Sequence, residues 1–369
     1  MRWVVKIGSN SLTDENGSIS QDKILFLIED IVHLRHEGVD VVLVSSGAIA
    51  YGRALLGKGS KPLTLPEKQA LAALGQPHLL AHYRDTADHF GLKVAQLLLT
   101  RSDFDRRERY VRIRQTTDVL LAEQVLPIVN ENDTVSVAEI RFGDNDILSA
   151  LLAINIEADR LIILTDIDGL YDAPPLKVPG AKKIERVETW DDALLLKASD
   201  RGSVLGTGGM QSKLNAARLA TEAGIETWVM RFERGSLERH FRGEHTGTQF
   251  VAAPRSLSPK KRWLSKISRP LGTIWVDDGA REALLDKHKS LLFPGIVRLE
   301  GHFEAHDTVR VVDLKNDEIG RGIALVSAVD LTLLLERRQR GEAVPPVKEI
   351  IHRDGWVTTA AQPSSNSSF

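Results

Sequence analysis

The alternation of apolar and polar segments along the chain predicts repeated strand, helix and strand units. Residues 3–8 and 39–44 form short apolar runs that are typical of buried strands. Between them, residues 24–34 carry apolar side chains at the helical period of about 3.6 residues, and Gly38 is the glycine expected at the end of that helix. Because these lengths fit a βαβ unit, we expect a mainly parallel sheet.

Four further apolar runs of strand length extend this alternation. They lie at residues 94–100, 125–129, 160–165 and 225–231. We expect the first of them to be a third buried strand and the last to be the final strand of its domain. Arginines alternate with acids in residues 101–114, which favours a helix that faces solvent or a neighbouring subunit. Strands that alternate with helices in this way indicate an α/β protein.

The character of the chain changes between residues 254 and 270, where lysines and arginines stand among serines and prolines. We predict a linker at 254–270, a first domain at 1–253 and a second at 271–355. The second contains one predicted helix near 280–287 and short strand candidates between glycine and aspartate turns, so we expect a small β-rich domain. Residues 356–369, rich in serine, predict a disordered tail. The strand candidates are residues 273–276, 297–299, 308–312 and 322–326.

Carboxylate and amide side chains gather directly after the apolar run at 125–129. That run predicts a strand, and residues 143–146 predict the start of a helix near Ile147. The cluster therefore lies at the carboxyl end of a strand, where open α/β sheets bind ligands. Any single member is more typical of a turn or a cap, but the two groups together favour a ligand site. The members are Asn130, Glu131, Asn132, Asp133, Asp144, Asn145 and Asp146.

Three turns that contain glycine offer backbone N–H groups to an anion. The first strand ends at Gly8, close to Lys6, whose side chain either reaches water or binds a phosphate. Ser45-Ser46-Gly47 follows the second strand and opens a helix. The loop at 205–213 lacks the Walker A order, yet Lys213, the backbone donors and the helix dipole would converge there on one anion.

The composition limits the classes of function. A formal net charge of −2 excludes a chain-wide nucleic-acid or membrane-surface binder. Because the chain has no cysteine, disulfides, thiolate nucleophiles and zinc–cysteine sites are excluded as well. His78 and His82 share a helix face, but the glutamate of the zinc-protease pattern is missing, so we assign them no metal. Neither a signal peptide nor a membrane-spanning apolar run is evident, which predicts a cytoplasmic protein.

Six motifs in the first 250 residues together resemble the amino-acid kinase family. This resemblance implies a three-layer αβα sandwich with a mainly parallel sheet. The second domain resembles a PUA domain through residues 276–280 and 290–296, which implies a small β-rich barrel. The six motifs are VVKIGSNSL at 4–12, SSGAIAYGR at 45–53, NENDTV at 130–135, FGDNDILSA at 142–150, LTDIDGLY at 164–171 and GTGGMQSK at 206–213.

The pairing of these two domains is similar to the members of the family that act on L-glutamate. The resemblance implies transfer of the γ-phosphoryl group of ATP, with Mg²⁺ bridging the phosphates, to the side-chain carboxylate of L-glutamate. This would be the first step of proline biosynthesis, with feedback inhibition by proline. A carboxylate with a reference pKa of about 4.3 is ionised at neutral pH, so the reaction needs no general base. Catalysis then consists of bringing two anions together and stabilising the transferring group.

The resemblance also assigns roles to individual residues. Lys6 and Lys213 would hold the phosphates from opposite sides, and Asp146 would hold the two lysines. Gly8 and Gly47 would supply N–H groups near the reacting oxygens, and no residue is assigned as a metal ligand. Glutamate would be bound by Ser46, Asp133 and Asn145. The nucleotide would be bound by Lys6, Thr165, Asp166, Thr207, Gly208, Gly209, Met210, Gln211, Ser212 and Lys213.

Partners and alternatives follow from the same comparison. The resemblance implies a homo-oligomer, either a dimer or a tetramer, and glutamyl-phosphate reductase as a partner. Another carboxylate kinase of the same fold, acting on aspartate or acetylglutamate, is the nearest alternative. A second alternative is an RNA-binding or RNA-modification protein that uses the basic stretch 255–269 and the PUA-like domain, and it predicts salt-dependent affinity. We favour a structural or regulatory role for that domain because no aromatic stacking platform is evident.

Overall fold

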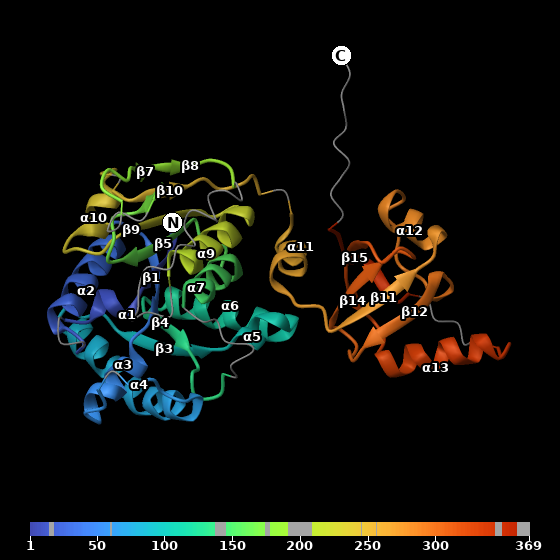
Figure 1. The fold of residues 1–369 in the computed structure, drawn as a ribbon, viewed down its shortest axis with the longest axis horizontal. Coiled ribbons are helices and arrows are strands. Elements are labelled where there is room, and N and C mark those ends of the chain that lie inside the picture. The colour runs from blue at the N-terminus through green and yellow to red at the C-terminus, as the bar shows by residue number, and fades with distance from the viewer. Residues whose placement is uncertain are drawn as a thin grey trace, which may run out of the picture. The chain divides into compact units, whose positions relative to one another are not determined.

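The structure is a computed structural model in which the chain divides into two units. The first comprises Met1–Asp103 and Val111–Arg255, and the second comprises Phe104–Tyr110 and Ser256–Phe369 (Figure 1). The residues described are 1–14, 18–59, 61–136, 145–173, 178–190, 209–244, 246–255, 257–343 and 349–359.

An eight-stranded sheet, built from described residues, forms the centre of the first unit. Its neighbouring strands are parallel except for the antiparallel pair β9 and β10. The central position of β1 places the carboxyl ends of β2 and β5 on either side of it at one edge. In spatial order the strands are β3 (Val94–Leu99), β4 (Leu126–Glu131), β2 (Asp40–Ser45), β1 (Arg2–Ile7), β5 (Arg160–Thr165), β9 (Glu226–Arg231), β10 (Thr248–Phe250) and β8 (Arg186–Val187).

Helices cover both faces of this sheet, which confirms the three-layer α/β prediction (Figure 1). Helices α2 and α4 pack together and contact β2 and β3, whereas α7 and α9 pack together and contact β1, β5 and β9. The helices of this region are α1 (Ser9–Leu12), α2 (Gln21–His36), α3 (Ala48–Leu55), α4 (Leu65–Asp88), α5 (Arg101–Asp105), α6 (Arg107–Ala122), α7 (Asn145–Asn155), α9 (Met210–Glu222) and α10 (Ser236–Phe241). A two-stranded ribbon joins β6 (Leu170–Tyr171) to β7 (Lys183–Ile184).

Side-chain alternation along β1 decides which layer each residue joins. Trp3, Val5 and Ile7 belong to the apolar core that α2 completes. Burial of each such side chain contributes roughly 1.5–3 kcal/mol. Lys6 has the opposite parity, so its side chain leaves the sheet on the face that α7 covers. The strand sequence therefore sends one cation into the interior.

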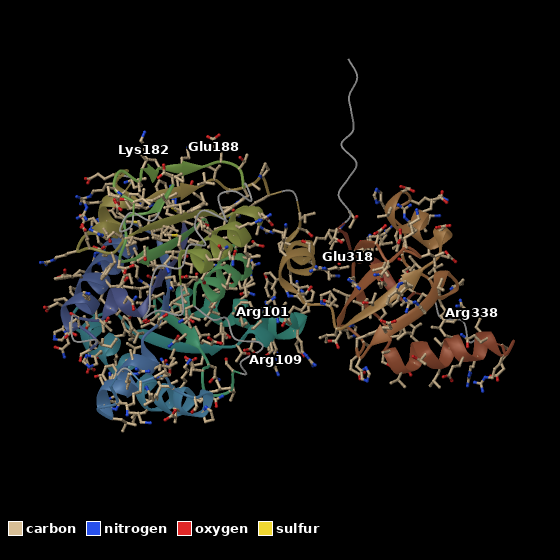
Figure 2. All side chains as sticks on the ribbon, viewed as in Figure 1. Arg101, Arg109, Lys182, Glu188, Glu318 and Arg338 are labelled. Atoms are coloured by element: carbon tan, nitrogen blue, oxygen red, sulfur yellow. The ribbon has the colours of Figure 1, made fainter. Side chains whose placement is uncertain are left out.

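Two predictions about the sheet need correction. The segment predicted as a third buried strand is β3, which lies at the sheet edge and has mostly part-exposed or exposed side chains, such as Leu98. An apolar run does not distinguish an edge strand from a central one. The run at 225–231 is β9, but it is not the last strand, because the three-residue β10 follows it. At the opposite edge, the exposed Lys182 and Glu188 point away from the ribbon beside the very short β8 (Figure 2).

The second unit is built on a five-stranded sheet of described residues in the order β12, β11, β13, β14, β15. Helix α13 and strand β15 were not predicted, and β15 extends the domain beyond the predicted limit at residue 355. The remainder of the predicted tail, 360–369, lies outside the described residues. The elements are β11 (Gly272–Val276), α12 (Asp278–Leu285), the 3₁₀ turn η2 (Phe293–Gly295), β12 (Ile296–Gly301), β13 (Thr308–Val312), β14 (Glu318–Ala324), α13 (Ala328–Gln339) and β15 (Ile351–Thr358).

The predicted basic linker contains two helical elements. Helix α11 (Pro259–Arg262) continues into the π-helix η1 (Trp263–Ile267). Trp263 is fully buried, and its indole Nε1 donates to the backbone oxygen of Phe104 within the second unit. Arg262 is also buried, so part of the basic stretch is occupied in packing rather than presented to a polyanion.

Candidate active site

Two lysines and one aspartate form a buried charged cluster at the carboxyl edge of the central strands. The Nζ atom of Lys6 lies 2.5 Å from Oδ1 of Asp146, and the Nζ atom of Lys213 lies 3.2 Å from Oδ2 of the same carboxylate. Lys6 is 1% exposed and Asp146 is 0% exposed. Of the two interpretations of Lys6, the one in which its side chain reaches water is therefore wrong. Each oxygen of Asp146 pairs with a lysine from a different element, β1 and α9.

The local sequence explains how these three charges meet. Lys6 is on the central strand β1, flanked in register by Val44 of β2 and Ile163 of β5. Helix α7 starts at Asn145, two residues before the predicted start at Ile147, so Asp146 lies in the first turn. There the helix dipole favours a carboxylate. The residues expected to precede this helix, including Asp144, lie outside the described ranges.

The cluster gathers two ammonium groups at one carboxylate, an arrangement that suits an anionic ligand. Asp146 contacts both Lys6 and Lys213. Lys213, 7% exposed, is the more accessible of the two lysines. Ammonium groups bind phosphate oxygens through charge-assisted hydrogen bonds, so a polyphosphate is the type of ligand that this arrangement can hold.

Gly8 and Gly47 lie at the ends of β1 and β2, beside the cluster and the following helix. A Cβ atom on Gly8 would lie 3.6 Å from Nζ of Lys6, so this backbone passes close to the ammonium group. Gly47 caps α3 with φ of 113°, a conformation that residues other than glycine rarely adopt. Gly8 therefore brings main chain within ordinary contact distance of the ammonium group, and the turn at Gly47 requires a backbone conformation that favours glycine.

A neutral hydrogen-bond network lies next to the charged cluster, on the adjoining residue of α7. Asn145 donates from Nδ2 to the backbone oxygen of Ser45 at 2.7 Å, to Oγ of Ser46 at 2.9 Å and to Oδ1 of Asn130 at 2.7 Å. Asn130 donates from its own Nδ2 to Oε1 of Gln76 at 2.6 Å. Ser46 and Asn145, the two residues of this network that were predicted to bind the substrate, are therefore joined by a direct hydrogen bond.

The sequence did not point to two members of this region. Gln76 belongs to α4, whose apolar pattern gives no functional signal. Tyr83, also on α4, is fully buried and shares a 2.9 Å hydrogen bond with Oγ of Ser45. Burial raises the pKa of Tyr83 well above its usual range, so its hydroxyl stays protonated at neutral pH. Only the packing of α4 against this edge brings both residues to the site.

The residues predicted to bind the nucleotide divide into two groups. Thr165 ends β5 and donates from Oγ1 to Oδ1 of Asp166 at 3.0 Å. Gly209 caps α9, and Met210, Gln211 and Ser212 form its first turn before Lys213. Strand β5 is the direct neighbour of β1, which carries Lys6, and α9 carries Lys213, which pairs with Asp146. Thr207 and Gly208 lie outside the described residues.

Asp133 completes the substrate-binding residues that were predicted. It lies in the turn after β4 and is half-buried. Glu131, the last residue of β4, accepts a hydrogen bond from Oγ of Ser136 at 2.8 Å, which closes this turn. The carboxylates of Asp133 and of the exposed Asp166 follow strands that end at the same sheet edge, so oxygen donors of the kind that Mg²⁺ prefers are present there.

His78 and His82 form an aromatic cluster with Tyr51. The Tyr51 hydroxyl lies 2.6 Å from Nε2 of His82, and the Tyr51 ring stacks on that of His78. Within the described residues, no group of three potential metal-ligating side chains is found. In the same part of the chain, no helix is both long and apolar enough to cross a membrane.

The fold and the site together define a phosphoryl-transfer enzyme with a mainly parallel αβα sheet. The chain belongs to the amino acid kinase family, which residues 1–231 match, and residues 272–344 match the PUA domain. It is 44% identical to the glutamate 5-kinase of Dictyoglomus thermophilum over 355 residues, 96% of this chain and 94% of that protein. It is also 44% identical to the glutamate 5-kinase of Pelobacter propionicus over 361 residues, 96% of this chain and 97% of that protein.

A solved structure shares the fold of the kinase region. Carbamate kinase from Giardia lamblia bound to AMP-PNP superimposes with a TM-score of 0.50 at 19% sequence identity, covering 68% of this chain and 98% of that one. At this identity the likeness concerns the fold alone. The substrate of the present chain must therefore be argued from its own residues and from the relatives of higher identity.

Proposed function

We propose that this chain transfers the γ-phosphoryl group of ATP to the side-chain carboxylate of L-glutamate, giving L-glutamyl 5-phosphate and ADP. The observation that carries this proposal is the buried cluster of Lys6, Asp146 and Lys213 beside the bonded pair Ser46 and Asn145. The first suits a polyphosphate and the second a small polar substrate. The names of the 44% identical relatives support the same reaction.

The reaction consists of one displacement at phosphorus. A carboxylate oxygen of the substrate forms a bond to the γ-phosphorus, the bond from that phosphorus to the β,γ-bridging oxygen breaks, and ADP leaves with its electron pair. No proton moves, because the carboxylate is already ionised. Lys6 and Lys213 would stabilise the negative charge on the equatorial and leaving oxygens, while Asp146 holds their ammonium groups apart and in place.

Mg²⁺ would accompany the nucleotide and neutralise part of the phosphate charge. We assign it no protein ligand of its own. The main-chain N–H groups at Gly8 and Gly47 would meet the reacting oxygens, since both turns lie at the ends of the strands that flank the cluster. Thr165, Asp166 and the start of α9 would hold the rest of the nucleotide.

The donor and acceptor pattern of the neutral network suits a free amino acid. Both N–H groups of Asn145 are engaged, so within the described residues its Oδ1 is the atom that can take a further donor. Ser46 accepts from Asn145, which leaves its own O–H to donate to a carboxylate. Asp133 lies in the turn that follows β4. The site would therefore offer the Asp133 carboxylate and Oδ1 of Asn145 as acceptors to an ammonium group, and the Ser46 hydroxyl as a donor to a carboxylate.

This pattern separates L-glutamate from its nearest competitors. N-acetyl-L-glutamate has lost the positive charge and two of the three N–H donors of the ammonium group, so it leaves acceptors unpaired. L-Aspartate is shorter by one methylene, which misplaces the reacting carboxylate; one methylene changes discrimination by roughly 10–200-fold.

The test is ATP-dependent acyl-phosphate formation, trapped as a hydroxamate, with L-glutamate, L-aspartate and N-acetyl-L-glutamate compared, each with and without proline. We expect activity on L-glutamate at least about tenfold above that on the other acids. Activity confined to another acid would overturn the substrate and leave the phosphoryl-transfer cluster standing. Inactivity on all three would overturn the proposed function.

The family resemblance supports further proposals about the setting of this reaction. We propose that the enzyme is a cytoplasmic homo-oligomer, a dimer or a tetramer, inhibited by proline. Its acyl-phosphate product would pass to glutamyl-phosphate reductase. Light scattering of the purified chain tests the subunit number, and suppression of hydroxamate formation by proline tests the inhibition.

A further inference from the structure

We infer that Gln76 is a positioning residue for substrate binding, acting through Asn130 on Asn145. This inference rests on the proposed function, because it takes Asn145 and Ser46 to contact the amino-acid substrate. The chain of side chains is short: Oε1 of Gln76 accepts from Nδ2 of Asn130 at 2.6 Å, and Oδ1 of Asn130 accepts from Nδ2 of Asn145 at 2.7 Å.

Two main-chain groups fix the direction of every bond in this chain. The backbone N–H of Glu131 donates to Oδ1 of Asn130 at 2.8 Å, and a backbone N–H can only donate. The oxygen of the Asn130 amide must therefore face Glu131 and Asn145, and its NH₂ group must face Gln76. The backbone oxygen of Ser45 can only accept, so it holds the NH₂ group of Asn145 in turn.

Gln76 supplies the last acceptor that this arrangement requires. Asn130 is 3% exposed, so without Gln76 its NH₂ group would lose its acceptor in a place that water does not reach. Such an unpaired buried donor is costly, and the side chain could avoid the cost only by rotating its amide group. Turning would point its NH₂ group at the N–H of Glu131 and the NH₂ of Asn145, which are both donors. Loss of the acceptor at position 76 would thus loosen Asn130 and, through it, Asn145.

The backbone that carries Gln76 is held firmly beside the site. A Cβ atom on its neighbour Gly75 would fall 1.9 Å from the backbone oxygen of Ala48 and 2.6 Å from the backbone nitrogen of Gly52. Helix α4 therefore packs backbone to backbone on α3, whose first residue follows Gly47. This close contact holds the backbone next to Gln76 against the first turn of α3.

The test compares substitutions of Gln76 that remove or keep the acceptor. In Gln76→Leu and the smaller Gln76→Ala, we expect KM for L-glutamate to rise roughly tenfold while KM for ATP changes less than about twofold. Gln76→Glu keeps a carboxylate oxygen in the place of Oε1 and should restore KM for L-glutamate to within about threefold of the original value. The two apolar variants differ in size, so that at least one is expected to fold.

Gln249→Leu is the matched control. Gln249 is a glutamine of the same unit whose Oε1 accepts from Arg186 at 3.2 Å on strand β10, away from this network. It should leave both KM values unchanged. An unchanged KM for L-glutamate in the folded apolar variants, an equal rise for ATP, or a Gln76→Glu variant as impaired as Gln76→Leu would each overturn the inference. Inactivity of the unsubstituted enzyme on L-glutamate would instead overturn the proposed function itself.

Discussion

The candidate active site has two halves that differ in chemistry: the charged cluster, called the phosphate half, and the neutral hydrogen-bond network, called the substrate half. The phosphate half carries formal charges in the interior: Lys6, Asp146 and Lys213. The substrate half, one residue away on α7, centres on the neutral amides Asn145 and Asn130. Both halves depend on the first turn of the same helix, so a single element sets their separation.

The difference follows from what each half must do. The negative charge of a transferring phosphoryl group is spread over several oxygens. Ammonium groups in fixed positions can stabilise this charge, because their attraction to it depends little on direction. A free amino acid presents an ammonium beside a carboxylate, so its orientation must be set by directional donors and acceptors. Under the proposed function, the phosphate half would therefore govern turnover, and the substrate half would govern affinity and selectivity.

The largest effect is expected from removing a lysine. Lys6→Ala or Lys213→Ala should lower kcat by roughly 10²–10³-fold or more, because one stabilising contact to the transferring group disappears. The hydroxamate assay at saturating ATP and L-glutamate measures this, with circular dichroism to confirm that each variant is folded. Near-normal turnover in either variant would break the assignment of the phosphate half.

Asp146→Asn tests whether the carboxylate serves to hold the lysines. It removes the carboxylate charge that contacts both buried ammonium groups, so we expect a stability loss of roughly 3–5 kcal/mol in the absence of ligands. The phosphates of ATP would bring negative charge to the same two ammonium groups. Thermal denaturation with and without ATP should therefore show a larger ATP-induced rise in Tm than in the original protein, and an equal rise in both would contradict this role.

A smaller effect, confined to one substrate, is expected at Asn145. Asn145→Asp removes the NH₂ group that bonds Ser45, Ser46 and Asn130, and it places a carboxylate against the backbone oxygen of Ser45. KM for L-glutamate should rise at least about tenfold with little change in KM for ATP. Equal increases in both KM values would mean that the two halves are not separable.

Asp30 sharpens the comparison because it is a buried carboxylate that, among the described residues, pairs with no lysine. It accepts from the backbone N–H of Leu237 at 2.8 Å, and burial raises its pKa from 3.8 to about 6 despite that hydrogen bond. The folded state then holds the proton more tightly than the unfolded state, so the contribution of Asp30 to stability falls as pH rises from about 4 to about 6 and is level above it.

Asp30→Asn is predicted to remove this pH dependence. The rise from 3.8 to about 6 corresponds to roughly 3 kcal/mol at most, and the amide oxygen can still accept from Leu237. Chemical denaturation at pH 4, 5, 6 and 7 measures the free energy of unfolding. A slope in the variant that matches the original between pH 4 and pH 6 would show that other groups cause it.

Much of the site was predictable because its residues follow strands whose apolar pattern is clear. Lys6, Ser46 and Asp133 come directly after or within such runs, and parallel strands bring their carboxyl ends to one edge. Gln76 and Tyr83 were not predictable in this way. They lie on a long helix whose sequence pattern specifies an apolar face but not the strand end that the helix meets.

The amino-acid sequence by itself determined the α/β alternation, the separate β-rich domain and the motif residues, because hydrophobic period and turn chemistry are local properties. Tertiary structure alone decided that Lys6 is buried rather than solvated, since burial depends on what α7 and α9 place against β1. It also decided that β3 is an edge strand, that the basic stretch folds around Trp263, and that the amide of Gln76 on α4 accepts from Asn130, the hydrogen-bond partner of Asn145. Each of these depends on contacts between residues distant in sequence, which no local pattern encodes.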